Sequence, residues 1–486
     1  MIPATPDALQ TVADAAGLPL YRQVYERFRS AIAEGALKPG DRIPSARALA
    51  KEIGVARGTI EVAYSLLASE GYIQARGQAG TVVAPNLQPA ARMASAASAA
   101  PAAPAAPAAR ARPAEAVEDR WPRPAAPLPF QMGLPALDAF PRKIWARLGA
   151  RHLRGMQPPD LGYPDPAGLP GLRTATAAYL QVARGIQCTP RQVFITSGYN
   201  NTMQLIMQAL FKPGDSVWVE DPGYPPTRVL LAQAGMQAVP VRVDAEGLVV
   251  EAGIAQEPRA RAAVVTPAHQ SPLSLSLSLP RRQALLDWAE RNSAWIVEDD
   301  YDGEYRYVGR PLPALKSLDR QGRVLYSGTF SKVLFPGMRL AYLVVPVEQV
   351  PRFERLCMLL AGGAPALTQA VLTSFINEGH FARHIQRMRR LYSERRHATA
   401  AALTDVMGSR LRIDLQPGGM HLVARLEGHQ TDRELASRML QHGLYAQALS
   451  HWSAAPDARS GLLMSFTNIV SAEQAEQLAR RILQLM

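Results

Sequence analysis

One low-complexity segment limits how this chain can fold. Residues 93–115 read MASAASAAPAAPAAPAARARPAE and contain almost no large apolar side chain. Such a segment buries no core, and its prolines favour extended conformations. It predicts a linker over 86–127 between a small domain, residues 1–85, and a large domain, residues 128–486.

The rest of the composition is typical of a globular chain. Hydrophobic residues make up 48% of it and charged residues 19%. No apolar run reaches the roughly 18 residues that cross a bilayer, and the N-terminus lacks the basic start and apolar core of a signal peptide. Cys188 and Cys357 offer neither a disulfide framework nor metal-ligand spacing. We expect a cytoplasmic protein with no metal site and no membrane contact.

The net charge of +12 favours contact with phosphate, but it does not locate a binding domain. Residues 1–85 contain nine Lys plus Arg against eight Asp plus Glu, so this segment is nearly neutral. Any nucleic-acid-binding surface in this segment must therefore be inferred from the positions of individual arginines.

The stretch IPSARALAKEIGVARGTIEVAYSLLASEGYI predicts a helix-turn-helix. Ser45 can cap a helix that runs to Ile53, Gly54 supplies the tight turn, and a second helix begins near Arg57. An amphipathic helix within residues 19–37 precedes this pair.

A helix-turn-helix places the first residues of its second helix in the major groove of DNA. Arg57 and Thr59 should therefore approach bases or phosphates, and Arg47 on the preceding helix should contact the backbone. The following YIQARGQAGTVVA predicts a hairpin in which Gly77 permits close approach of the main chain, with Arg76 beside it. This pattern indicates a winged domain that binds double-stranded DNA; the alternative is an ordinary three-helix bundle with surface arginines.

Beyond the linker, short apolar runs alternate with helical patterns. The runs are QVFIT, SVWVE, AAVVT, AWIVED, RVLYSG and LAYLVV. This order predicts an α/β domain with a mainly parallel sheet covered by helices, in which ligand groups gather at the carboxyl ends of the strands. From about Phe381 onward, helices and the strands HLVARL and GLLMSF indicate a smaller α+β lobe.

The segment GTFSKVLFPGMRLAY contains a single lysine, Lys332. Enclosure near another cation such as Arg339 lowers the pKa of its amine, and an amine of this kind condenses with an aldehyde. Thr329, Ser331 and Arg339 offer hydroxyl groups and a guanidinium, which hold phosphate. The phosphorylated aldehyde that matches is pyridoxal phosphate, bound as a Schiff base on Lys332.

Two motifs upstream supply further contacts for this cofactor. Ser197, Gly198 and Tyr199 in TSGYNN stand where a strand turns into a helix, an arrangement that cradles an anion. Tyr224 in EDPGYP offers a ring for stacking on the pyridine.

Two later motifs address the polar atoms of the pyridine ring. Its nitrogen needs a carboxylate, which either Asp299 or Asp300 in VEDDYDGEYRY can supply. In TPAHQSP, either His269 or Gln270 can reach a cofactor oxygen. Five motifs in a fixed order, each after an apolar strand, together indicate a pyridoxal-phosphate site.

The same motifs carry a resemblance to known families. Residues 18–84, with LKPGDRIPSARALAKEIGVARGTIEVAYSLLASEGYI, resemble the winged helix-turn-helix of GntR-type transcription factors, which implies DNA roles for Arg47, Arg57, Thr59 and Gly77. TSGYNN, EDPGYP, TPAHQSP, VEDDYDGEYRY and GTFSKVLFPGMRLAY resemble fold type I aminotransferases. The whole chain is similar to the MocR subfamily, whose members are pyridoxal-phosphate-binding transcriptional regulators.

This resemblance implies further properties of the site and of the assembly. It implies an internal aldimine on Lys332, Asp299 as the partner of the pyridine nitrogen, and Tyr301 as a donor toward the ring oxygen. It also implies a homodimer in which the chains associate head to tail.

Four features depart from the family pattern. Glu61 stands where some relatives carry arginine, Asn200 and Asn201 replace two glutamines, and Ser274 replaces a glycine. The strand GLLMSF has no arginine where an aminotransferase would bind a substrate carboxylate, although Arg459 lies just before it. Without a carboxylate clamp, transamination loses the positioning that it needs.

We therefore expect a regulator that senses pyridoxal phosphate, a small amine or an amino acid through Lys332, rather than a dedicated enzyme. Two alternatives are a working aminotransferase that carries a DNA-binding head, and a repressor that uses the transferase fold only for dimerisation.

Overall fold

The structure is a computed structural model, and the residues that it describes are 19–33, 35–75, 80–84, 124–309, 313–360, 363–428, 430–455 and 460–486. The chain divides into two compact units, and we describe each of them by itself. Among the described helices, none is long and apolar enough to cross a membrane. The described residues also contain no group of three or more His, Cys, Asp or Glu that could hold a metal ion.

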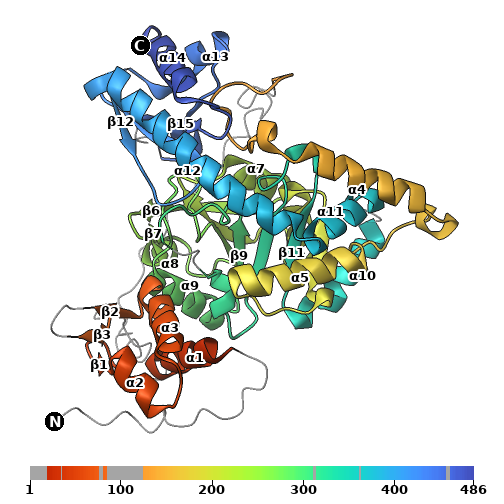
Figure 1. Cartoon of the computed structure of the whole chain (residues 1–486), viewed down its shortest axis with the longest axis vertical. Helices are drawn as coiled ribbons and strands as arrows, with labels where there is room; N and C mark the ends of the chain where they lie inside the picture. The colour runs from red at the N-terminus through yellow and green to blue at the C-terminus, as the bar shows by residue number, and fades with distance from the viewer. Residues whose placement is uncertain are drawn as a thin grey trace. The chain divides into compact units, whose positions relative to one another are not determined.

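The N-terminal unit combines three helices with a small antiparallel sheet (Figure 1). The helices are α1 (Leu20–Ala33), α2 (Ala46–Glu52) and α3 (Arg57–Ser69). The strands lie in the order β1-β3-β2, with β1 (Arg42–Ile43), β2 (Ile73–Ala75) and β3 (Thr81–Val83). The winged helix-turn-helix predicted from the sequence is confirmed.

Local sequence explains this unit well. The Ser45 side chain accepts a hydrogen bond of 3.2 Å from the amide of Ala48 and so caps α2, because the first amides of a helix have no partner within the helix itself. On α1, Val24, Phe28 and Ile32 are all buried, in agreement with the predicted apolar face. The ring of Phe28 meets that of Tyr64 on α3 edge to face, with 5.4 Å between ring centroids.

The large unit is built on a mixed sheet of eight strands in the order β4-β11-β10-β9-β8-β5-β6-β7. Their bounds are β4 (Val193–Thr196), β5 (Ser216–Asp221), β6 (Gln237–Asp244), β7 (Gly247–Leu248), β8 (Ala262–Val265), β9 (Trp295–Asp300), β10 (Val324–Thr329) and β11 (Ala341–Val344). The strands from β10 to β6 run parallel, while β11 and β7 run antiparallel to their neighbours. The sequence did not predict β6, whose Pro240 and Arg242 interrupt its apolar pattern.

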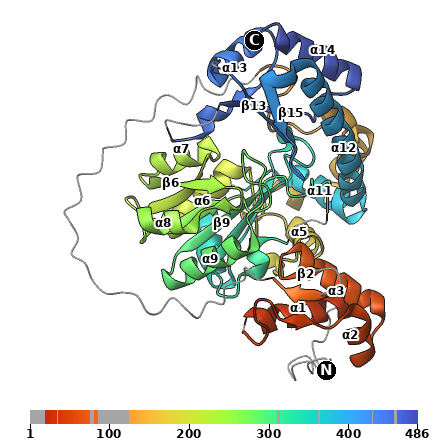
Figure 2. The ribbon, with the colours of Figure 1, turned by 90° about the vertical axis from the view of Figure 1, so that its left-hand side faces the viewer.

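Helices pack on both faces of this sheet (Figure 2). One face is covered by α6 (Tyr199–Leu210), α7 (Pro225–Gln233) and α10 (Val350–Leu360). The other carries α4 (Arg142–Gly155), α5 (Pro170–Arg184), α8 (Val250–Gln256), α9 (Leu279–Arg291) and α11 (Ala366–Asn377).

Strand alternation assigns neighbouring residues to opposite faces. Val217 and Val219 on β5 point to the core beneath α6 and α7. Trp218 between them points the other way and stacks on Trp288 of α9, with 3.9 Å between ring centroids. These strands are buried on both faces, which is why they read as continuous apolar runs.

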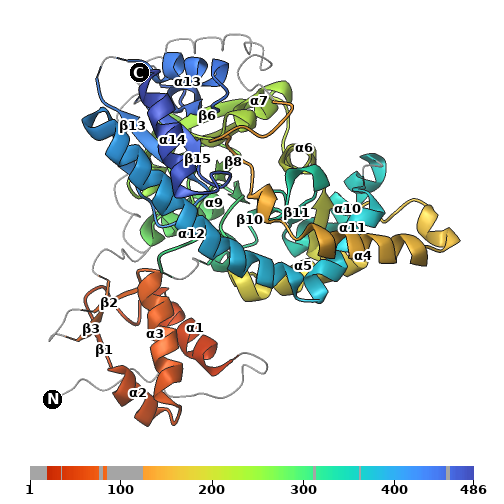
Figure 3. The same ribbon diagram turned by 45° about the horizontal axis from the view of Figure 1, so that its top comes forward.

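The C-terminal lobe is a four-stranded antiparallel sheet backed by helices (Figure 3). The strand order is β12-β13-β15-β14, with β12 (Leu411–Asp414), β13 (His421–Leu426), β14 (Gln447–Ala448) and β15 (Gly461–Ser465). The helices are α12 (His380–Met407), α13 (Asp432–Gln441) and α14 (Ala472–Leu483). The start of α12 packs into the core beside the large sheet and its remainder into the core of the lobe, so one helix joins the two.

Candidate functional site

Loops that follow β4, β5, β8, β9 and β10 meet at one edge of the large sheet. Register explains part of this convergence, because Ala341 on β11 pairs with both Thr329 on β10 and Thr196 on β4. The residues that follow Thr329 and Thr196 are therefore neighbours, although more than a hundred positions separate them in the chain. All five motifs predicted from the sequence lie at this edge.

Lys332 lies in the turn after β10, and its amine donates a hydrogen bond of 2.9 Å to the carbonyl of Gly133. A Cβ on Gly133 would lie 2.7 Å from Nζ, and the φ of this glycine is +78°, so another residue would displace the lysine. Burial lowers the pKa of the Lys332 amine, while the carboxylates of Asp299 and Asp302 oppose this shift. The depressed pKa agrees with the sequence prediction, but its cause is burial rather than the nearby Arg339.

A second group of residues forms a positively charged corner at the start of α6. The Arg339 guanidinium lies close over Gly198. A Cβ atom on that glycine would be 3.4 Å from Nη2 of the arginine. The N-terminus of α6 has no side-chain cap, so its amides carry a partial positive charge. Asn201, one of the family departures, accepts a hydrogen bond of 3.1 Å from the Ser197 amide through its Oδ1 atom.

The two hydroxyl residues beside Lys332 lie at the same edge. The Oγ1 atom of Thr329 accepts a hydrogen bond of 3.2 Å from the amide of Ser331. This bond holds the turn between β10 and the lysine, and it uses neither the Thr329 nor the Ser331 hydroxyl proton.

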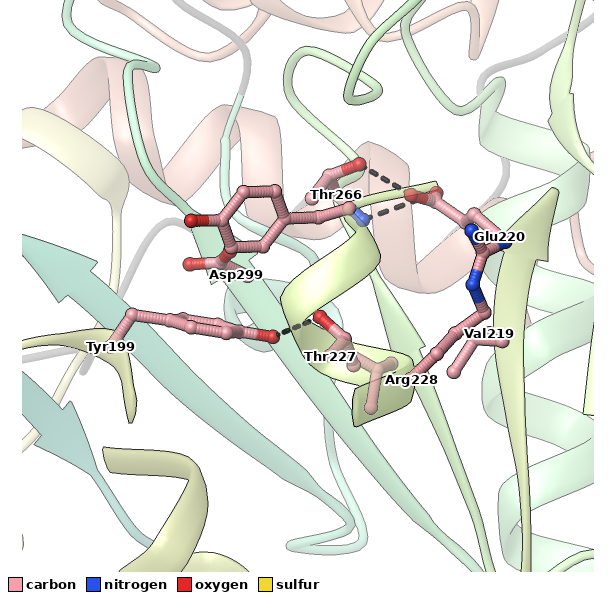
Figure 4. Close-up of a pocket in the computed structure, with 9 residues that line it drawn as sticks. Tyr199, Val219, Glu220, Thr227, Arg228, Thr266 and Asp299 are labelled. Atoms are coloured by element: carbon pink, nitrogen blue, oxygen red, sulfur yellow. Dashed lines mark hydrogen bonds between the residues drawn. The ribbon is translucent and has the colours of Figure 1, made fainter. Parts of the chain in front are cut away.

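The two adjacent aspartates at the end of β9 have different environments. Asp300 accepts hydrogen bonds of 2.7 Å from Arg184 and 2.6 Å from the Tyr326 hydroxyl. Asp299 instead lines a pocket (Figure 4). Burial and the charges of Asp300 and Glu220 raise its pKa to about 8. Of the two candidates, Asp299 is therefore the one available to a ligand.

Glu220, at the end of β5, faces the same pocket and was missed by sequence reasoning. Figure 4 shows its carboxylate pointing toward Thr266, from which it accepts hydrogen bonds of 3.1 Å (amide) and 2.5 Å (hydroxyl). The Gln270 side chain donates a third, of 3.2 Å. Burial raises the pKa of Glu220 to about 7 despite these donors.

The raised pKa of Glu220 predicts how the stability of the cofactor-free protein depends on pH. Between the ordinary pKa of glutamate and about pH 7, the Glu220 carboxyl is protonated in the folded state but ionised in the unfolded state. The contribution of Glu220 to stability therefore falls as pH rises through this range. Glu220→Gln cannot ionise, and its unfolding free energy relative to wild type should rise by about 1 kcal/mol per pH unit between about pH 5 and 7. Urea unfolding followed by tryptophan fluorescence measures the unfolding free energy at each pH. Glu427→Gln, at an exposed position, is the control. If the difference in unfolding free energy between Glu220→Gln and wild type did not change with pH, the assignment would be contradicted.

Aromatic residues lie beside the two pocket carboxylates. Tyr224, at the start of α7, is 39% exposed and therefore accessible for stacking. Its ring centroid lies 5.5 Å from that of Tyr199, whose hydroxyl is 2.6 Å from Oγ1 of Thr227 (Figure 4).

His269 and Gln270, the alternatives after β8, are both engaged within the protein. Nδ1 of His269 lies 3.0 Å from Oδ1 of Asp302, and both side chains are buried. Gln270 donates to Glu220 and, at 2.8 Å, to the carbonyl of Pro222. Ser274, the third family departure, adopts a φ of +55°, which explains why glycine suits that position.

The arrangement fits pyridoxal phosphate on independent grounds. One buried oxygen next to the site, Oδ2 of Asp302, has no hydrogen-bond partner within the described residues. Unsatisfied buried oxygens are costly and indicate an interaction supplied by a ligand. When bound, the cofactor supplies a pyridine ring that withdraws electrons from an attached amine, and a carboxylate such as Asp299 keeps the ring nitrogen protonated.

Three of the five candidate DNA-binding residues lie within the described part of the N-terminal unit, where Arg47 and Arg57 are exposed and Thr59 is partly exposed. Arg57 and Thr59 occupy the first turn of α3, and Arg47 is exposed on α2. The Arg57 side chain is paired with Glu61 at 2.8 Å, and both are well exposed. Arg76 and Gly77 lie outside the described residues.

Sequence reasoning missed two further contributors to the site. Gly133 precedes the large sheet in the unremarkable stretch QMGLP, and only the fold brings it to Lys332. Asp302 follows the recognised aspartate pair by two positions and orients His269. Its position in VEDDYDGEYRY was the one available signal.

Comparison with known families agrees with this geometry. Residues 20–83 match the model for bacterial regulatory proteins of the gntR family. Residues 136–482 match the model for aminotransferase class I and II, whose members bind pyridoxal phosphate.

Relatives carry both parts in one chain. The chain is 37% identical over 456 residues to the probable rhizopine catabolism regulatory protein MocR of Rhizobium meliloti, covering 93% of this chain and 91% of that protein. It is 33% identical to the pyridoxine biosynthesis transcriptional regulator PdxR of Corynebacterium glutamicum, covering 91% of each. TauR of Rhodobacter capsulatus is also 33% identical, over 93% of this chain and 95% of that one.

Solved structures match the large unit. Kynurenine aminotransferase of Pyrococcus horikoshii aligns with a TM-score of 0.67 and 26% identity, covering 74% of this chain and 90% of that one. The α-aminoadipate aminotransferase LysN of Thermus thermophilus, complexed with N-(5'-phosphopyridoxyl)-L-leucine, gives 0.67 and 27%, covering 74% and 91%. The chain belongs to the MocR subfamily of GntR-type transcriptional regulators, in which a helix-turn-helix domain precedes an aminotransferase-like, pyridoxal-phosphate-dependent domain.

Proposed function

We propose that this regulator senses pyridoxal phosphate, or a small amine or amino acid that reacts with it, at Lys332, and that occupancy alters its binding to operator DNA. One observation carries the proposal: the low-pKa amine of Lys332 lies at the same sheet edge as the Gly198–Arg339 corner and Asp299. A ligand shifts only those states that it binds with different affinity, so the sensed compound must act through this site.

Each predicted residue then has a proposed role. Lys332 attaches the cofactor, Tyr224 stacks on its ring and Asp299 binds the ring nitrogen. The residues proposed to hold the phosphate are Ser197, Gly198, Tyr199, Thr329, Ser331 and Arg339. Tyr301 is proposed to donate to the ring oxygen, with His269 and Gln270 holding the surrounding loop through Asp302 and Glu220.

The proposed domain limits are 1–85 for DNA binding, 86–127 for the linker and 128–486 for sensing and dimerisation. Within the first, Arg47, Arg57, Thr59, Arg76 and Gly77 are proposed to contact double-stranded DNA.

The proposed assembly is a head-to-tail homodimer. Exposed apolar side chains near the end of α10 support it, since Met358 is 62% and Leu359 82% exposed. Tyr163 is fully exposed. It lies in a loop close to the end of α10, as shown by Gly363, where an added Cβ would lie 3.6 Å from the side chain of the adjacent Pro164. An apolar surface of this kind indicates a protein contact.

The experiment that tests the function combines a spectrum with DNA binding. Purified full-length protein should show the absorption of bound pyridoxal phosphate, and its affinity for DNA from upstream of its own gene should change several-fold when the cofactor is removed or an amine is added. Unchanged affinity in every state would rule out the sensor. Steady conversion of an amino donor and a 2-oxo acid would instead identify a working aminotransferase.

Arg57 provides a separate test of the DNA-binding surface. Arg57→Ala should weaken binding to the upstream fragment by about tenfold or more, the scale of a lost arginine contact, and leave the cofactor spectrum intact. Glu61→Ala removes the carboxylate that pairs with Arg57 and should not weaken binding. Fluorescence anisotropy at fixed salt compares the two, and equal affinities for wild type and Arg57→Ala would contradict the assignment.

A further inference from the structure

The sheet of the C-terminal lobe has two faces that differ in their surroundings. On β15, Leu462 and Met464 point into the core of the lobe, beneath α12 and α14. Leu463 points the opposite way and pairs across the strands with Val423 on β13. This second face packs against the short 3-10 helix Leu449–Trp452 of the lobe and against two residues of the large unit outside the lobe, Met132 and Leu273.

Six apolar residues gather on that second face, and we call them the apolar wall. They are Met132, Leu273, Val423, Leu449, Trp452 and Leu463. Val423, Leu449, Trp452 and Leu463 are buried, whereas Met132 and Leu273 are partly exposed.

Three connections place the apolar wall beside the proposed attachment point. Met132 directly precedes Gly133, whose carbonyl accepts the hydrogen bond from the Lys332 amine. The Leu273 amide donates a hydrogen bond of 3.0 Å to the side chain of Gln270.

The third connection is aromatic. The ring of Trp452 lies 5.8 Å from that of Tyr224, the proposed stacking partner, and the amide of Gly223 donates to the Trp452 carbonyl at 3.0 Å. These contacts join the apolar wall to the segments of Gly133, Gln270 and Tyr224, so we expect a group carried by a cofactor at Lys332 to meet this wall.

Two described arginines near this wall, Arg228 and Arg425, already have partners. Arg228 donates to the Trp452 carbonyl at 3.2 Å and lies 3.7 Å from Asp221. Arg425, on the same sheet face as Val423, is paired with Asp414 at 2.5 Å. Arg459 lies outside the described residues.

We propose that the sensed compound is a primary amine with an apolar aliphatic or aromatic substituent and no carboxylate next to the amine. A carboxylate against the wall would lose its hydration without gaining an unpaired cation from the described residues that line it, which is unfavourable, whereas an apolar group there gains contact. This inference rests on the proposed function, because the amine must reach the cofactor at Lys332.

A matched pair of ligands tests the inference on wild-type protein. 2-Phenylethylamine and phenylalanine differ only in the α-carboxylate. Titrated into full-length protein loaded with pyridoxal phosphate, the amine should perturb the cofactor absorption with an affinity at least about tenfold higher than the amino acid, since only the latter must desolvate a charge. Its effect on DNA binding, followed by anisotropy, should show the same order.

The outcomes separate this inference from the proposed function. Absence of the cofactor band would overturn the function itself. A bound cofactor that responds better to phenylalanine, or to neither compound, would overturn the effector class alone.

Leu463 supplies the matched variants. Leu463→Arg should reverse the preference by placing a cation at the wall, while Leu463→Met should keep the wild-type order. Circular dichroism and retained cofactor absorption verify folding of both variants. If Leu463→Arg does not fold, the comparison of the two ligands on wild-type protein still decides the question. If Leu463→Arg folds and still prefers the amine over the amino acid, the apolar wall does not set the preference.

Discussion

Lys332→Ala is expected to abolish the absorption band of protein-bound pyridoxal phosphate, because it removes the amine to which we propose that the cofactor is attached. The remaining contacts, the Gly198–Arg339 corner and Asp299, would hold the cofactor only non-covalently. The free cofactor should then be lost on gel filtration. Fold and stability should change little, since within the described residues the lysine makes a single hydrogen bond, to the Gly133 carbonyl.

Two measurements and one control make this result specific. Borohydride reduction followed by peptide mass mapping should place the pyridoxyl group on Lys332 in wild type. Lys212→Ala, at an exposed turn, should bind cofactor like wild type. Retention of the absorption band in Lys332→Ala would show that attachment occurs elsewhere.

Arg184→Met is expected to lower the free energy of unfolding by about 3–5 kcal/mol, the cost of leaving a buried charge without its partner. Arg184 is buried on α5 and contacts two carboxylates, Asp300 at 2.7 Å and Glu304 at 3.1 Å. The Tyr179 hydroxyl also donates to Glu304, at 2.7 Å. The variant would leave both carboxylates buried without a cation.

The pH dependence of this loss follows from the same contacts. Burial opposes ionisation of Asp300, but Arg184 and the Tyr326 hydroxyl hold its pKa below the usual value. Without Arg184 the carboxylates should take up protons in the folded state. The deficit should therefore be largest near neutral pH and shrink as pH falls, because a protonated carboxyl tolerates burial.

An exposed ion pair provides the control for Arg184. Arg191 pairs with Glu354 at 3.2 Å, but its side chain is 74% exposed. Arg191→Ala should cost about 0–1 kcal/mol, as exposed pairs usually do. Urea unfolding measures both variants, and equal losses would contradict the role assigned to the buried network. Because Asp300 is adjacent to Asp299, Arg184→Met should also weaken cofactor binding.

Much of the fold could be read from local patterns. The Ser45 cap, the apolar face of α1 and the hairpin all depend on residues close together in the chain, and the structure contains each of them. Strands such as β5 and β9 were recognisable because they are buried on both faces. β6 was missed because its exposed positions, proline and arginine weaken that pattern.

The candidate site divides in the same way. Strand-to-loop transitions located Lys332, Asp299 and Tyr224, since ligand groups follow the carboxyl ends of parallel strands. The nearby residues alone could not show which of Asp299 and Asp300 faces a ligand, and only the family resemblance favoured Asp299. The difference between them depends on Arg184 and Tyr326, which are distant in sequence.

The sequence by itself determined the two kinds of domain, the order of the motifs that follow the strands and the choice of Lys332 as the proposed attachment point, because each depends on the chemistry and spacing of nearby residues. Only the tertiary structure decided which aspartate faces the pocket, which carbonyl holds Lys332 and which side chains stand opposite it. Gly133 and Glu220 carry no local signal of their positions at the site. Their positions arise because sheet register and packing bring together segments that the sequence keeps far apart.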